Sequence, residues 1–246
     1  MNENRSGTGR TDERAPGAGD HVMAKKLMLI PIVHSEKEMG SLKSDISEMI
    51  DRKFGKEKRD QHRKDVALFW DNLRTMVDTV LVNIDGSAVR IYQDGMPIGG
   101  EIGAKLIAMG AKDGIPNHQI VLSIIEHGGV LEKTESPALI KEEYEIIKSV
   151  VNAATDMERE ALSEKFKHRL YELTLERDKF IAGRINESLR DGEFGMLFIG
   201  ATHDVAPYIS QDIDLFVCNF VLDDIIAWLK RGMADTRNGV PAQKCP

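Results

Sequence analysis

The 246-residue sequence has little cysteine, no long apolar run and no excess of positive charge. It contains two cysteines, Cys218 and Cys245, which are too few for a disulfide framework or a cysteine-based metal knuckle. Low cysteine content is typical of a reducing compartment. No stretch reaches the roughly 18 apolar residues that cross a bilayer, and residues 1–20 lack the apolar core of a secretory signal. These absences predict a soluble, cytoplasmic protein with no membrane partner.

The balance of charge excludes a further class of partner. The formal net charge is -7, whereas a nucleic-acid-binding surface needs a basic footprint. We therefore expect no nucleic-acid partner. The contents of 41% hydrophobic and 30% charged residues are ordinary for a globular protein. The sequence predicts a single domain over residues 25–234, between a disordered tail at 1–24 and a flexible tail at 235–246.

Two continuous apolar runs, residues 27–33 and 195–199, predict strands that are buried on both faces. Pro31 lies inside the first run, and because proline has no amide proton it indicates a sheet edge, a bulge or the end of the strand. Further strands are predicted over three segments: 79–84, 89–92 and 213–217.

Helices are predicted between the strands, over residues 35–76, 101–109, 118–126, 136–190 and 221–230. Ser136 and Pro137 favour a helix start, and the fifty residues that follow predict two or three helices with a break near 154–157. Strands that alternate with long helical segments favour parallel pairing through helical crossovers. The expected fold is α/β, with a mostly parallel central sheet flanked by helices and a long helical segment before the last core strands.

His34 and His203 are the strongest candidates for a site, because each follows a predicted strand at its carboxyl end. Open α/β sheets place their ligands at that edge. If the two strands are neighbours, both imidazoles would converge there. Together with a carboxylate they could hold a divalent metal (Mn, Zn or Co), which lowers the pKa of a bound water and makes it a nucleophile. The simpler interpretation is that each histidine caps a loop by hydrogen bonding.

Glu176, Arg177 and Asp178 lie late in the long helical region. They are either a solvated charged face or inward-facing groups that orient a substrate or a metal ligand.

A polar segment around the predicted strand 79–84 supplies further candidates. Asp85 ends that strand and is a possible metal ligand, while Arg90 and Tyr92 are possible substrate-binding residues. Two turns that flank a short strand would explain the same segment. Glu36, beside His34, is a further candidate for substrate or metal binding.

The order of these segments resembles a superfamily that includes the TraB/PrgY proteins, the TIKI metalloproteases, the ChaN-like haem-binding proteins and the erythromycin-esterase-like enzymes. The matching segments are 31–34 (PIVH), 80–85 with Arg90, 176–179 (ERDK) and 200–203 (GATH). There are two departures: Pro31 stands where a glycine is expected, and Asn83 where an acidic residue is expected, which weakens the ligand set. Residues 92–95 and 198–201 also resemble an uncharacterised bacterial protein family.

Three functions remain open. The first is a metal-dependent hydrolase, with His34, His203, Glu176 and Arg177 as catalytic residues and with His34, His203, Asp85 and Asp178 as metal ligands. The second is a non-catalytic module that binds a small molecule or peptide in the same pocket. The third is a scaffold that forms a homodimer through the helices of residues 137–190.

Overall fold

The computed structural model describes residues 24–33 and 55–238, with side chains as far as Lys230. Five strands form one sheet in the order β3-β2-β4-β1-β5, and every pair of neighbours is parallel. The strands are β1 (Lys25–Ile32), β2 (Val89–Gln93), β3 (Val130–Leu131), β4 (Phe194–Gly200) and β5 (Ile213–Val217). The predicted α/β class is confirmed, and the sheet is parallel throughout.

Six α-helices flank the sheet in the described part of the chain. They are α2 (Lys56–Leu81), α3 (Gly100–Lys112), α4 (Pro116–Glu126), α5 (Pro137–Val151), α6 (Asp156–Ser188) and α7 (Leu222–Asn238). Two short 3-10 helices, η2 (Gly86–Ala88) and η3 (Ala206–Tyr208), precede β2 and β5. The 33-residue α6 is the long helix expected before the last two strands, and the break between α5 and α6 lies at residues 152–155, two residues before the predicted 154–157. In the described segments, no helix is both apolar enough and long enough to span a bilayer.

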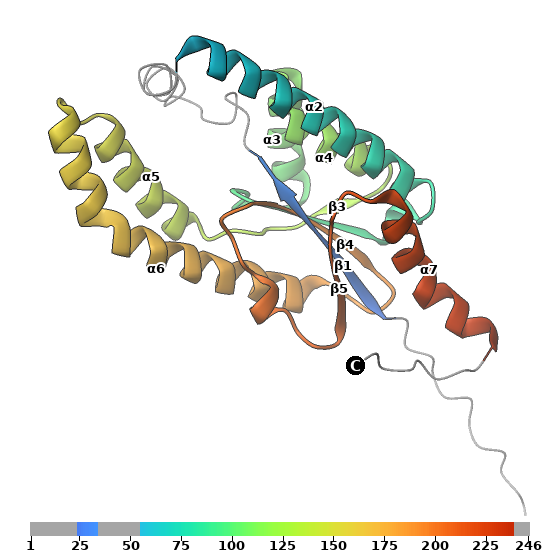
Figure 1. The fold of residues 1–246 in the computed structure, drawn as a ribbon. Helices are drawn as coiled ribbons and strands as arrows, with labels where there is room; N and C mark the ends of the chain where they lie inside the picture. Colours follow the sequence, from blue (N-terminus) through green and yellow to red (C-terminus); the bar gives the residue numbers. More distant parts are fainter. Residues whose placement is uncertain (1–23, 34–54, 239–246) are drawn as a thin grey trace, which may run out of the picture.

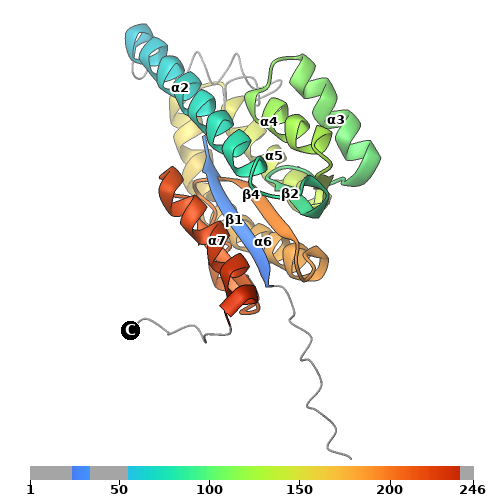
Figure 2. The same cartoon turned by 90° about the vertical axis from the view of Figure 1, so that its right-hand side faces the viewer.

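The helices form two layers on opposite faces of the sheet. Helix α6 covers one face, while α2, α4 and α7 cover the other (Figures 1 and 2). Strand β1 supplies Met28, Ile30 and Ile32 to the core on the α2 side, and Leu27 and Leu29 to the core on the α6 side. Burial on both faces explains why the strand has a continuous apolar sequence instead of an alternating one.

Pro31 lies near the end of β1, beyond the last residue of β1 that pairs with β5. The end of the strand was one of the three positions that this proline predicted. The Leu29 carbonyl accepts a hydrogen bond from Cys218 just past β5, so the backbone of Leu29 faces β5. Residues two apart on a strand face the same side, and Pro31 therefore also faces β5. The β1–β5 register stops at Leu29 and Val217, so the missing amide proton breaks no ladder hydrogen bond.

The strand predicted over residues 79–84 is wrong, because residues 79–81 end α2 and residues 82–84 form the turn that follows it. Its β-branched content favoured a strand, but Leu73, Val77, Val80 and Leu81 repeat at helical spacing and are all buried. Asn83 follows the helix and donates from Nδ2 to the Thr79 carbonyl. It therefore occupies no strand position.

The described residues can be compared with the predicted domain boundaries at both ends of the chain. Helix α7 extends to Asn238, beyond the predicted domain end at residue 234. The predicted tail at 1–24 lies outside the described residues except for Ala24.

Candidate functional site

The two strands that precede the predicted histidines are neighbours. In the β1–β4 register, Ile32 pairs with Gly200 at the carboxyl end of both strands. From there the chain leaves β1 toward β2 and leaves β4 toward β5, in opposite directions across the sheet. Such a reversal is the position at which open α/β sheets bind their ligands. His203 lies three residues after β4, whereas His34 and Glu36 fall outside the described residues.

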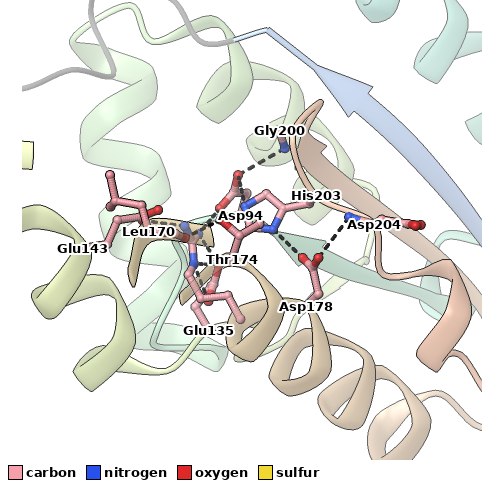
Figure 3. Close-up of polar contacts among 10 residues, drawn as sticks. Asp94, Glu135, Glu143, Leu170, Thr174, Asp178, Gly200, His203 and Asp204 are labelled. Carbon is pink, nitrogen blue, oxygen red and sulfur yellow. Dashed lines mark hydrogen bonds and ion pairs between the residues drawn. The ribbon is translucent and has the colours of Figure 1, made fainter. Parts of the chain in front are cut away.

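His203 is held by a carboxylate of α6. Its Nδ1 lies 2.5 Å from Asp178 Oδ1, and the other oxygen of Asp178 accepts a hydrogen bond from the Asp204 amide at 3.0 Å (Figure 3). The side chains of His203 and Asp178 are 4% and 2% exposed. Because a carboxylate accepts hydrogen bonds, Nδ1 carries the proton of the neutral ring and Nε2 carries the lone pair. Nε2 lies 3.8 Å from Asp94 Oδ2.

Arg177, the residue before Asp178, binds three carboxylates that come from different parts of the chain. Its Nη2 lies 2.6 Å from Asp94 and 2.5 Å from Glu135, and its Nη1 lies 2.5 Å from Glu143 on α5 (Figure 3). Burial opposes the charge of Arg177, but the three acids hold its pKa above the ordinary value. Glu135 has no exposed surface, and burial raises its pKa although Arg177 acts in the opposite direction.

Asp94 lies between Arg177 with its acids and His203 with Asp178. We refer to the whole group as the edge cluster: Asp94, Glu135, Glu143, Arg177, Asp178 and His203. Asp94 directly follows β2, accepts from Arg177 at Oδ1, and accepts from the Gly200 amide at Oδ2 over 3.1 Å. It therefore ties the carboxyl ends of β2 and β4 together, beside His203.

Sequence reasoning gave no site role to Asp94, Glu135 or Glu143. Asp94 carried a usable signal, because it follows the predicted strand 89–92 just as His203 follows 195–199. Glu135 had no comparable signal, since β3 is only two residues long and its sequence does not mark a strand.

The structure places two further candidates at the opposite edge of the sheet. Asp85 precedes β2 and caps η2, where hydrogen bonds from the Ser87 amide and hydroxyl lower its pKa. Arg90 is the second residue of β2 and forms ion pairs of 2.7 Å with Glu132 and 2.6 Å with Glu193. Because all strands run in one direction, these groups lie away from the carboxyl edge that carries His203.

Two more candidates have partners of their own elsewhere. Tyr92 is fully buried, which raises its pKa, and its hydroxyl lies 2.8 Å from Ser188 Oγ at the end of α6. Glu176 forms a 2.7 Å ion pair with Arg169 on the exposed side of α6. Of the predicted site residues, the structure thus brings together Arg177, Asp178 and His203.

The described residues contain no group of three or more histidine, cysteine or acidic side chains arranged to hold a metal ion. No protein family, curated protein or solved structure matches the chain in sequence or fold comparisons. The edge cluster is therefore the feature of the chain that bears on its function.

Proposed function

We propose that the protein is a metal-dependent hydrolase with its centre at the edge cluster. The observation that carries the proposal is the bond between Asp178 and Nδ1 of His203, which leaves Nε2 directed toward Asp94 at the carboxyl edge of the sheet. Histidines that bind metals are commonly held in this way by a carboxylate on the other ring nitrogen.

The charge of the edge cluster supports a bound cation. Four carboxylates face one guanidinium and one imidazole, so negative charge remains in excess even when His203 is protonated. Buried negative charge is costly unless a proton or a cation compensates it. A divalent metal would supply that compensation.

His203 and Asp94 are the described residues that would hold the metal. The 3.8 Å between Nε2 and Oδ2 is a few tenths of an ångström longer than the spacing of two tetrahedral ligands with bonds of about 2.0–2.2 Å, so a small approach of the two side chains would let them share one ion. His34 stays a prediction as a further ligand, since β1 ends beside β4. When bound, the metal supplies a water of lowered pKa as nucleophile.

The protein's own residues have positioning roles in this proposal. Asp178 fixes the tautomer and direction of the His203 ring. Arg177 donates hydrogen bonds to Asp94, Glu135 and Glu143. Because its donors are engaged by these acids, its proposed role is to orient Asp94 and not to bind an anionic group of the substrate.

Metal binding to the whole chain tests the proposal. After treatment with a chelator, titration with Mn²⁺, Zn²⁺ or Co²⁺ should raise the melting temperature, since a ligand at about 100 times its Kd stabilises a protein by about 2.7 kcal/mol. His203→Ala should abolish the shift, and Asp178→Asn should weaken affinity about 10–100-fold. His168→Ala removes a histidine that is 83% exposed on α6 and should leave binding unchanged.

The same preparations should hydrolyse at least one of a panel of ester, phosphoester and peptide substrates, and His203→Ala should lose that activity. Absence of stabilisation by all three metals would overturn the metal site. Hydrolysis that survives in the His203→Ala variant would overturn the catalytic centre.

A second candidate is a module that binds a small molecule or peptide without turnover. One observation favours it over catalysis: the charged groups of the cluster are already paired with one another. Arg177 and His203 are nearly enclosed, and each charged group has a partner within the protein. In that case a ligand would raise the melting temperature without being consumed, and His203→Ala would lose binding while keeping the fold.

A further inference from the structure

Helix α3 has an apolar stripe on the face that points away from the protein. Ile102, Leu106 and Met109 are 63%, 43% and 64% exposed. Spacings of four and three residues place these side chains on one face of a helix. A helix at the surface of a globular protein normally has charged and polar residues on that face.

A neighbouring face of α3 is fixed by close packing, so the stripe cannot turn inward. Gly103, Ile107 and Gly110 are buried there. A Cβ at Gly103 would lie 2.3 Å from the Ile98 carbonyl oxygen and 3.0 Å from Leu131 of β3, and one at Gly110 would lie 1.9 Å from the His118 ring of α4. The α3 helix lies at the outer side of the molecule, with α4 between it and α2 (Figure 2).

Charges of opposite sign stand at the two ends of the stripe. Glu101 begins α3 and Lys112 ends it, and both are exposed. They are eleven residues apart, which is about three turns, so they lie on the same flank and roughly 16 Å from each other. That distance is too long for an ion pair within one helix. In two α3 helices packed antiparallel, each Glu101 would meet Lys112 of the other copy.

We propose that a second copy of this chain docks on the α3 stripe, with the two α3 helices antiparallel and with Glu101 of each copy paired to Lys112 of the other. A 13-residue helix is about 20 Å long, so the contact is smaller than the roughly 800 Å² per partner of a standard interface. A contact of this size is typical of a weak, transient association.

Light scattering or sedimentation of the full chain over a micromolar concentration series tests the proposal. The mass should rise from 27.5 kDa toward twice that value. In this register residue 106 of one helix lies beside residue 107 of the other, so Leu106→Lys places a positive charge from each copy in the middle of the contact and should weaken dimerisation at least about tenfold. Leu68→Lys is the matched control, because Leu68 is an apolar residue of α2 that is 61% exposed and lies off the stripe.

A charge exchange tests the antiparallel arrangement. Glu101→Lys and Lys112→Glu should each weaken the dimer, and the double variant should restore it, with far-ultraviolet circular dichroism confirming that all variants stay folded. A chain that remains monomeric, or an equal effect of Leu106→Lys and Leu68→Lys, overturns the proposal. A double variant as weak as the single ones overturns the pairing of Glu101 with Lys112. Metal binding at His203 is unaffected by either outcome.

Discussion

Replacement of Arg177 by methionine should destabilise the protein strongly, because it leaves buried acids without their counter-charge. The side chain of Arg177 is 8% exposed and binds Asp94, Glu135 and Glu143. Removal of one partner from a buried ion pair costs about 3–5 kcal/mol. For a chain of this length, each kcal/mol lowers the melting temperature by about 2–4 °C, so we expect a fall of about 6–20 °C near neutral pH.

The same helix provides a matched control. Arg169 also contacts several carboxylates, Glu142, Glu172 and Glu176, but it lies on the exposed side of α6. Solvent screens such pairs and offsets most of their attraction. Arg169→Met should therefore change stability only slightly, even though it removes as many ion pairs as Arg177→Met.

The dependence on pH gives the prediction a second, independent readout. Burial raises the pKa of Glu135 in the folded protein, so the folded state holds this proton more tightly than the unfolded state. Stability from Glu135 is then lost as the pH rises from its ordinary pKa through the raised value. Loss of Arg177 raises that pKa further. The deficit of Arg177→Met should thus be larger near pH 7.5 than near pH 5, in urea unfolding of both proteins.

Two results would refute this reasoning. Equal losses in Arg177→Met and Arg169→Met would mean that burial of the charges is irrelevant. A deficit that does not shrink at the lower pH would mean that unpaired carboxylates are not its cause.

Two smaller effects on the free energy of unfolding are predicted for the helices, both measurable by thermal or urea unfolding. Gly110→Ala should lower it by about 1–3 kcal/mol, because the new methyl group forces the His118 ring aside. Gly183→Ala should raise it by about 0.5–1 kcal/mol, because a methyl group there meets nothing within 4 Å. If both variants changed the stability in the same direction, the packing of α3 on α4 would be contradicted. Thr155 accepts a hydrogen bond from the Glu158 amide at the start of α6, so Thr155→Ala should cost about 0.5–2 kcal/mol and Thr155→Ser should be nearly neutral.

The central strands were predictable because burial on both faces produces a pattern that few other structures share. Residues 27–33 and 195–199 are apolar at every position, and they form the two neighbouring strands at the centre of the sheet. The segment 79–84 was wrongly predicted as a strand because valine and threonine favour strands locally. Tertiary contacts make its first half helical, since Val80 and Leu81 continue the buried face of α2 that Leu73 and Val77 begin.

The candidate site was predictable only in part. His203 was found because position after a strand is visible in a sequence, and Arg177 and Asp178 stood out as charges on a helix. Among the partners of Arg177, Asp94 follows a predicted strand in the same way, but Glu135 and Glu143 have no such signal. Asp94, Glu135 and Glu143 are separated by up to 49 residues along the chain, and only the packing of α5 and α6 beneath the sheet brings them to one guanidinium.

The order of the strands also constrains how the chain folds. Strand β1 is made first, yet both of its neighbours, β4 and β5, come more than 160 residues later. Contacts this distant in sequence form slowly, and an apolar strand without neighbours is prone to aggregation. A nascent chain that has reached the end of α6 already holds Arg177 and Asp178, but it has no strand to place beside β1 and no histidine for Asp178. The centre of the sheet and the edge cluster therefore cannot be completed before β4 and His203 have been made.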